Sequence, residues 1–205
     1  AGSFVIMIGP VPSVNRIDAH QHFWQYNRER DAWIIDEMRV IQRDFFPEDL
    51  LPHVKAHALE GTVAVQADQS EGETRFLLEL ANQHPFIKGV VGWLDLRSPS
   101  IESRLEHFSQ FRKLKGLRHV VQAEPTGFLL HPDFQRGIAA LRTYSYTYDI
   151  LIREHQLEEA IAFVTMFPEQ KFVVDHIAKP NIRNGNRSAW SKQMTELAKR
   201  SNVLC

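Results

Sequence analysis

The chain has 205 residues, of which 43% are hydrophobic and 24% are charged, and its formal net charge is −1. These proportions are typical of a soluble globular domain. Nucleic acid is disfavoured as a partner, because the basic residues are scattered and the near-zero charge gives little attraction for phosphates. The single cysteine, Cys205, cannot form an intrachain disulfide and suits a reducing compartment, so we expect a cytoplasmic protein.

Residues 1–15 resemble an N-terminal tail that precedes one domain of residues 16–205. The apolar run at residues 4–8 is too short for a membrane span and has no basic segment before it. The proline-containing connector at residues 9–12 leads stiffly into the first strand. We therefore expect no membrane partner.

Short apolar or β-branched runs alternate along the domain with segments of helical period. The expected strands are residues 17–22, 61–67, 89–94, 116–121, 148–152 and 172–176, with a last strand that begins at Asn202. Apolar stripes of helical spacing lie between them at residues 76–81, 101–108, 134–141, 157–164 and 190–197. A shorter helix is expected from Pro47 to Leu51, since proline is favoured in a first helical turn.

This alternation predicts parallel strands with helices packed against them. A closed barrel is favoured over an open sheet, because no glycine-rich phosphate-binding motif follows the first strand. The expected strand starts recur at intervals of (202 − 17)/6, or roughly 31 residues, as in a (β/α)8 TIM barrel of about 250 residues. The sequence ends within the seventh strand, so we expect a TIM barrel truncated in strand 7, with unpaired edges.

The most informative motif is Asp18-Ala-His20-Gln-His22 in the first strand. Successive side chains of a strand point to opposite faces, so the acid and both histidines share one face. Two such imidazoles can hold a divalent metal, or act as acid, base and electrophile around a carbonyl. The same spacing also occurs in solvated surface strands.

The same alternation assigns faces in two other strands. In the sixth strand it places Phe172, Val174 and His176 in one inward row and turns Asp175 toward the helices. In the fourth strand it separates the neighbours Arg118 and His119, unless the strand end bends. Asp18 should lie one pleat deeper in the barrel than His20.

Weaker candidates lie at other strand ends and in the long segment 24–57, which we expect to shape the active-site rim. Aromatic residues of this segment could line a cleft or simply pack beneath the loop; they are Trp24, Tyr26, Trp33, Phe45 and Phe46. The Tyr148 hydroxyl could reach a substrate. Gln66 and Trp93 fit a site or, equally, a buried amide and a packing indole.

Several sequence blocks occur in an order that resembles the lactonase-like branch of the amidohydrolase superfamily, the amidohydrolase 2 family. The first is Ile-Asp-Ala-His-Gln-His-Phe-Trp at residues 17–24. Others are Arg-Asp-Phe-Phe-Pro-Glu-Asp-Leu at 43–50, Val-Gln-Ala at 65–67, Glu-Thr-Arg-Phe-Leu-Leu-Glu-Leu-Ala at 73–81, Val-Val-Gly-Trp-Leu-Asp-Leu at 90–96, Lys-Gly-Leu-Arg-His-Val-Val-Gln at 115–122 and Val-Asp-His-Ile-Ala-Lys-Pro at 174–180. Together they cover nearly all of residues 16–205.

The resemblance implies a TIM barrel that hydrolyses a sugar-derived or dicarboxylate lactone by attack of water on the ring carbonyl. It implies catalytic roles for His20, His22 and His176, which would also be the ligands if a divalent ion such as zinc is bound. A metal-independent mechanism is also compatible, with the histidines and Arg118 as electrophile. The residues expected to contact substrate are Arg118, His119, Gln66, Trp24 and Tyr148.

One departure from the family pattern concerns the general base, an aspartate at the end of strand eight that usually precedes a Trp-Pro pair. The 205 residues end before that strand, so we expect this polypeptide to be inactive or impaired, by about 10²- to 10⁴-fold if a base is lost. Two alternatives remain: a metal-dependent decarboxylase of a sister branch, and a non-catalytic truncated barrel that self-associates. We assign no chemistry to the remaining histidines, His53, His57, His84, His107, His131 and His155.

Overall fold

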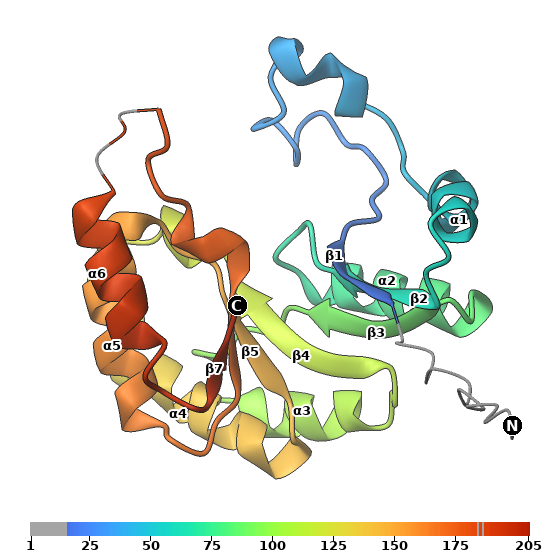
Figure 1. Cartoon of the computed structure of the whole chain (residues 1–205). Helices are drawn as coiled ribbons and strands as arrows, with labels where there is room; N and C mark the ends of the chain where they lie inside the picture. The colour runs from blue at the N-terminus through green and yellow to red at the C-terminus, as the bar shows by residue number, and fades with distance from the viewer. Residues whose placement is uncertain (1–15, 184, 186) are drawn as a thin grey trace, which may run out of the picture.

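Seven parallel strands, paired in chain order, form one sheet in this computed structural model, which describes residues 16–183, 185 and 187–205. The strands are β1 (Ile17–Gln21), β2 (Gly61–Val65), β3 (Ile87–Gly92), β4 (Leu114–His119), β5 (Thr147–Ile150), β6 (Phe172–Val174) and β7 (Val203–Leu204). Figure 1 shows that the sheet is strongly curved, with the helices on its outside. Because all the strands are parallel, their carboxyl ends lie at the same end of the curve.

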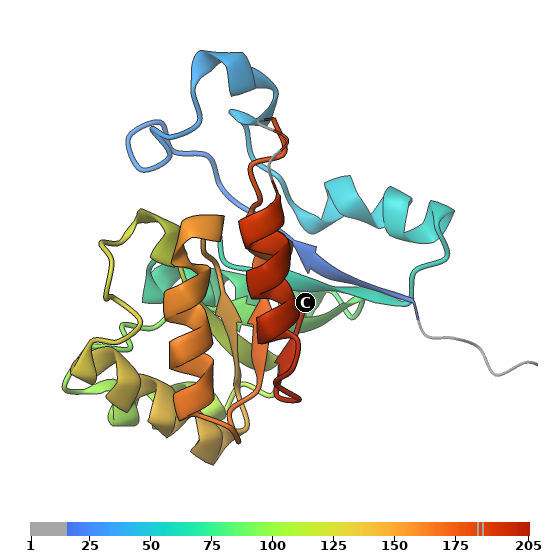
Figure 2. The ribbon, with the colours of Figure 1, turned by 60° about the vertical axis from the view of Figure 1, so that its left-hand side comes forward.

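Helices follow the strands at the predicted positions. They are α1 (Pro47–Ala56), α2 (Glu71–Gln83), α3 (Ile101–Ser109), α4 (Pro132–Leu141), α5 (Leu157–Met166) and α6 (Ser188–Leu197). Short 3-10 helices complete the connections: η1 (Asp36–Ile41), η2 (Val121–Ala123), η3 (Arg142–Tyr144), η4 (Glu154–Gln156) and η5 (Asp175–Ala178). Figure 2 shows α5 and α6 side by side against the sheet. The predicted succession of strands and helices is confirmed.

The hydrophobic core lies between the helices and the outer face of the sheet. Leu117 of β4 pairs with Tyr148 of β5, which in turn pairs with Phe172 of β6, and all three are fully buried. Their side chains meet an aromatic group from the helices, in which the Phe163 ring lies 5.3 Å from the Phe172 ring and 6.3 Å from the Tyr148 ring. The helical stripes seen in the sequence therefore cover this face.

The inner face of the same strands carries the alternate residues. Arg118 pairs with Asp149 across β4 and β5, one position beyond the pair that faces the helices. Deeper in the curve, Gly116 pairs with Thr147, and a Cβ atom at Gly116 would lie only 2.2 Å from the Thr147 hydroxyl oxygen. Position 116 therefore requires a glycine, because any side chain there would collide with the Thr147 hydroxyl.

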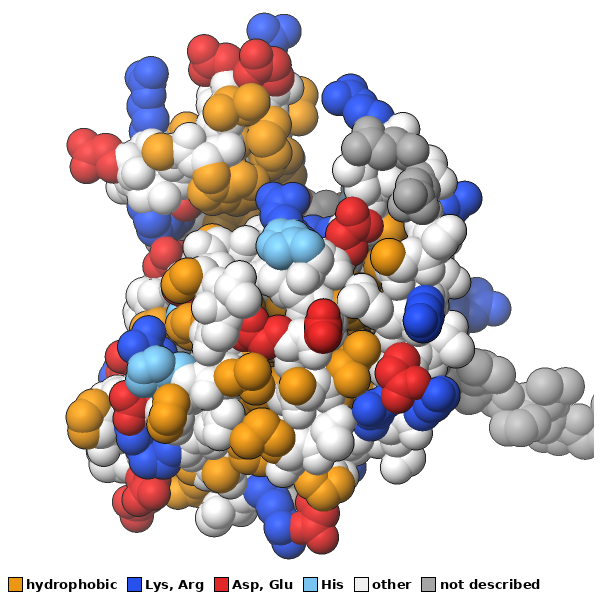
Figure 3. Space-filling view, turned by 90° about the vertical axis from the view of Figure 1, so that its left-hand side faces the viewer, with side chains coloured by type: hydrophobic (Ala, Val, Ile, Leu, Met, Phe, Trp, Pro, Cys, Tyr) orange, Lys and Arg blue, Asp and Glu red, His pale blue; other side chains and the backbone are white. Residues whose placement is uncertain are grey.

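The segment between β1 and α1 projects beyond the strand ends (Figures 1 and 2). An antiparallel bridge between Trp24 and Phe45 closes its base, and the two rings lie 4.5 Å apart. Figure 3 shows hydrophobic side chains gathered on the projecting part, where Trp33 is 60% exposed and Val40 is 76% exposed. Trp24 and Phe45 thus pack beneath the segment, whereas Trp33 remains at the surface.

The expected tail of residues 1–15 lies outside the described residues. Within the described ranges, no helix has the length and apolar character needed to cross a membrane.

Candidate functional site

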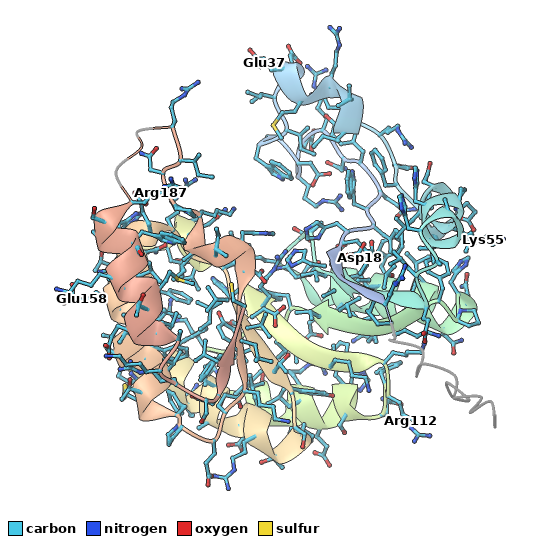
Figure 4. All side chains as sticks on the ribbon, viewed as in Figure 1. Asp18, Glu37, Lys55, Arg112, Glu158 and Arg187 are labelled. Atoms are coloured by element: carbon cyan, nitrogen blue, oxygen red, sulfur yellow. The ribbon has the colours of Figure 1, made fainter. Side chains whose placement is uncertain are left out.

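Polar side chains from several strands meet inside the curve, at the carboxyl ends of the strands. His20 comes from β1, Arg118 from β4, and Asp175 from the first residue after β6. In Figure 4, Asp18 marks β1, and Glu37 and Arg187 mark two segments that project beyond these ends. The sheet curvature therefore brings together groups from distant parts of the sequence.

Arg118 lies at the centre of this group and is only 4% exposed. Its Nη1 donates to Asp175 Oδ2 at 2.9 Å and to His20 Nε2 at 3.2 Å. Its Nη2 donates to the backbone carbonyl oxygen of Gln66. A side chain of β4 that reaches β1 and the ends of β2 and β6 must cross the interior of the curve, so Arg118 points inward.

The contacts of His20 fix its tautomer. A guanidinium has only donors, so His20 Nε2 must be the unprotonated acceptor and Nδ1 carries the proton in the neutral ring. This Nδ1 lies 3.5 Å from Asp175 Oδ1. Burial favours the neutral form of Asp175, but hydrogen bonding to His20 and the charge of Arg118 outweigh it and lower the pKa of this carboxyl. Asp175 is therefore an ionised acceptor shared by two donors.

His22 is held differently. Its Nδ1 donates to the backbone oxygen of Val65 at 2.8 Å, since a carbonyl can only accept, and this leaves the Nε2 lone pair free of that bond. Burial, followed by the charge of Arg118, lowers the pKa of His22 to about 4. The His22 ring lies edge-on to the His20 ring, at 5.0 Å. His22 is thus a neutral imidazole at physiological pH.

The end of β6 corrects two predicted directions. The strand ends at Val174, and Phe172 and Val174 face the helical core, not the interior. Asp175, which the prediction turned toward the helices, instead contacts Arg118 and His20. The predicted alternation had the wrong phase: because Val174 faces the helices, its neighbour Asp175 faces the interior, and the left-handed backbone that begins at His176 then brings the His176 ring toward His20.

The left-handed conformation continues beyond His176 through Lys179, with φ values between 46° and 56°. Non-glycine residues adopt it at a cost, and runs of it need support from their surroundings. Part of that support is the Lys179 ammonium group, which donates to Gln122 Oε1 at 2.6 Å. The turn brings the His176 ring to 4.7 Å from the His20 ring.

One group of side chains in the described ranges has the geometry of a metal site. His20, Asp175 and His176 each offer one donor atom, and these atoms lie within 4.8 Å of one another. Two imidazoles and one carboxylate form a ligand set found in catalytic zinc sites. The sequence predicted His22 as the third ligand, whereas the structure brings Asp175 into this group.

The remaining predicted residues take different places. Gln66 is fully buried, and neither polar atom of its side chain has a hydrogen-bond partner among the described residues. Tyr148 lies in the helix-side core, so the structure does not bring it to the site. His119 accepts a hydrogen bond from Trp93 Nε1 at 3.1 Å and contacts Glu124 at 2.8 Å, away from Arg118 as alternation predicts.

Sequence reasoning missed two residues of the site, Asp175 and Asp149. Asp149 is 5% exposed on the inner face, opposite Arg118, and burial and then the charge of Asp175 raise its pKa to about 7. The available signal was its spacing: it lies one residue beyond the core residue Tyr148, as Arg118 lies one beyond Leu117.

Comparison with known proteins gives consistent results. The family model described as amidohydrolase matches residues 17–205. An L-fucono-1,5-lactonase from Burkholderia multivorans is 40% identical over 93% of this chain, and one from Burkholderia ambifaria is 35% identical over 93%. This chain spans 66% of the length of each of these relatives.

A solved structure of an amidohydrolase from Burkholderia multivorans, with bound zinc, superimposes with a TM-score of 0.90 at 39% sequence identity. The match covers 94% of this chain and 69% of that chain. The described strands thus have the arrangement of an amidohydrolase TIM barrel up to strand 7, which confirms the predicted fold class.

Proposed function

Since the chain belongs to the amidohydrolase family, we propose that its protein hydrolyses a small lactone. The names of the two curated relatives support a sugar-derived lactone as the substrate. The observation that carries the proposal is the position of Arg118, a buried guanidinium between His20 and Asp175 at the carboxyl ends of the strands. Active sites of TIM barrels lie at this end.

Arg118 is proposed to bind the lactone oxygens. Attack of water on the ring carbonyl places negative charge on the carbonyl oxygen, and preorganised donors in a site shielded from water stabilise that charge. The contacts to Asp175 and to the Gln66 carbonyl hold the guanidinium in place before substrate arrives. A planar guanidinium fork suits oxygen pairs better than an ammonium group does.

His22 is proposed to orient the attacking water. Because Val65 fixes the proton on Nδ1, Nε2 presents a lone pair that can accept a hydrogen bond from water. The lowered pKa, about 4, keeps this nitrogen unprotonated across the physiological range. Such a nitrogen accepts a hydrogen bond but is a weak base, so His22 positions water better than it removes a proton.

His20, Asp175 and His176 fit a divalent ion, by the chemistry of their donor set and their mutual distances. The zinc in the related Burkholderia multivorans structure supports zinc as the ion. A bound zinc ion would act as a Lewis acid toward the lactone carbonyl. In the metal-independent alternative, Arg118 and the histidines are the only electrophiles, and metal content separates the two cases.

Two other functions remain as outcomes of the test. A decarboxylase would carry a firmly bound metal and release carbon dioxide from an aromatic acid. A non-catalytic barrel would self-associate and hydrolyse no lactone. We further propose a cytoplasmic location, on the ground of the single cysteine.

The test measures ring opening by the protein expressed from its own gene, with L-fucono-1,5-lactone, other sugar lactones and a pyrone dicarboxylate as substrates. Opening releases a proton at neutral pH, which an indicator dye follows. We expect Arg118→Gln to lower kcat/KM by about 10³-fold, as loss of an oxyanion-binding donor does.

The matched control is Arg112→Gln, because Arg112 is exposed and Figure 4 shows it away from the strand carboxyl ends. We expect its kcat/KM to stay within about twofold of wild type, as for an exposed surface change. A protein that opens none of the lactones, or an Arg118→Gln variant as active as wild type, would contradict the proposal.

A further inference from the structure

Asp149 has no role in the function proposed above, although it is buried beside the site. Its neighbours Tyr148 and Ile150 belong to the helix-side core, so Asp149 faces the interior of the curve. Its Oδ1 atom is inaccessible to solvent and has no hydrogen-bond partner among the described residues. A buried acceptor without a donor is costly, and each such atom calls for an explanation.

Arg118 presents the complementary feature. Its Nη1 and Nη2 groups are engaged, but its Nε is buried and has no acceptor in the described part of the chain. The register places Arg118 directly opposite Asp149 on the adjacent strand. An unpaired donor atom and an unpaired acceptor atom, among the described residues, therefore belong to two residues that are paired across adjacent strands.

The contacts of Arg118 conflict with a metal ion. Its Nη1 donates to Asp175 and to His20, two members of the three-residue donor group. A divalent cation bound to these residues would compete for the same carboxylate and imidazole and would repel the guanidinium at close range. Arg118 must then give up its Nη1 contacts.

We propose that Arg118 changes its carboxylate partner from Asp175 to Asp149 when a divalent cation binds to His20, Asp175 and His176. The backbone oxygen of Gln66 keeps Nη2 during the change and acts as the pivot. The inference rests on the metal site of the proposed function. Asp149 is in this view a positioning residue, which acts on the metal through Arg118.

The exchange moves the Arg118 guanidinium away from the donor group and at the same time pairs it with the Asp149 carboxylate. Without Asp149, a displaced guanidinium would be left buried with no carboxylate partner, which is strongly unfavourable. Metal affinity should consequently depend on Asp149, and this dependence should disappear when Arg118 is absent. A double-mutant cycle measures that coupling.

The experiment measures zinc binding, with zinc alone as the ligand, by calorimetric competition against a chelator at constant pH. The proteins are wild type, Asp149→Asn, Arg118→Gln and the double variant. We expect Asp149→Asn to weaken zinc binding by about 10- to 100-fold, the usual effect of losing an outer partner of a metal site. In the Arg118→Gln background the same change should alter affinity by less than about threefold, because no cation has to be relocated.

Glu158→Gln is the control for the loss of one negative charge, because Glu158 is exposed on α5 (Figure 4). It should change zinc affinity by less than about twofold, since exposed charges are screened. Equal weakening by Asp149→Asn in both Arg118 backgrounds would overturn the exchange, as would a wild-type protein that binds no zinc.

Crystal structures of the wild-type protein with and without zinc give a second readout that needs no variant to fold. The zinc-bound structure should show Arg118 bonded to Asp149, and retention of the Asp175 contact would overturn the exchange. Lactone hydrolysis is measured separately. Hydrolysis without the exchange contradicts only this inference, whereas zinc-driven exchange without hydrolysis contradicts only the proposed lactonase.

Discussion

The two faces of β4, β5 and β6 both carry buried residues, but of opposite chemistry. On the outer face, Leu117, Tyr148 and Phe172 are all completely inaccessible and meet the aromatic side chains of α4 and α5. On the inner face, Arg118 and Asp149 are 4% and 5% exposed, and each has a buried polar atom without a partner among the described residues.

This difference indicates that the outer face mainly stabilises the fold, whereas the inner face mainly provides groups for binding. Burial of the aromatic face is favourable by about 25 cal/mol for each Å² of apolar area removed from water. Burial of ions costs several kcal/mol for each ion before their attraction is counted. The inner face therefore stabilises the fold less than a hydrophobic face would, and its residues are explained by what they can bind.

The largest expected effect on stability comes from a substitution in the aromatic core on the outer face. Phe163 is fully inaccessible and packs against Phe134 and Phe172, so Phe163→Ala should lower the free energy of unfolding by about 3–5 kcal/mol. Urea denaturation measures this change. Met166→Ala on the same helix is the control, because Met166 is 52% exposed, and a loss of similar size there would contradict the argument.

A smaller effect of opposite sign is expected on the inner face. The fold raises the pKa of Asp149 from 3.8 to about 7, so between these values the native state binds more protons than the unfolded state. The free energy of unfolding therefore falls as pH rises through this window, and the full penalty is present above pH 7.

Asp149→Asn removes that titration. A shift of this size corresponds to about 4 kcal/mol, and the lost attraction to Arg118 offsets part of it. We therefore expect the variant to be more stable than wild type by about 2 kcal/mol at pH 8 and about equal at pH 4. Denaturation at both pH values tests this, and a pH-independent difference would contradict the assignment.

The smallest expected effect concerns His119, which adjoins Arg118 in the chain but bonds to Trp93 and Glu124. His119→Phe keeps the ring that stacks on Phe128 at 4.6 Å and loses both hydrogen bonds. It should destabilise the protein by about 1 kcal/mol and leave the KM for a lactone within about threefold. A tenfold rise in KM would instead indicate substrate contact.

The strand and helix positions followed from the sequence because hydrophobic periodicity is a local property. Alternation also separated Arg118 from His119 and placed His20 and His22 near each other at one end of the sheet. The lactonase-like resemblance rested on blocks spread over nearly the whole domain, and the family match at residues 17–205 confirms it.

The prediction failed at the end of β6, where the alternation of side chains was given the wrong phase. Val174 faces the helical core, so Asp175 faces Arg118, and the left-handed turn that follows brings the His176 ring to His20. Backbone angles of this kind depend on support from other loops, such as the Lys179 bond to Gln122, which a local pattern does not contain.

The sequence by itself determined the order of the helices and strands, because hydrophobic periodicity is a local property. It also determined that Arg118 and His119 lie on opposite faces and that His20 and His22 lie on one face, because these directions depend on spacing along one strand. Only the tertiary structure decided that Asp175 joins the donor group and that the Asp149 Oδ1 atom, at the strand position opposite Arg118, lies buried without a partner among the described residues. The reason is physical: burial, pKa and pairing of charges depend on which strands the curved sheet brings together, and those strands are far apart in the chain.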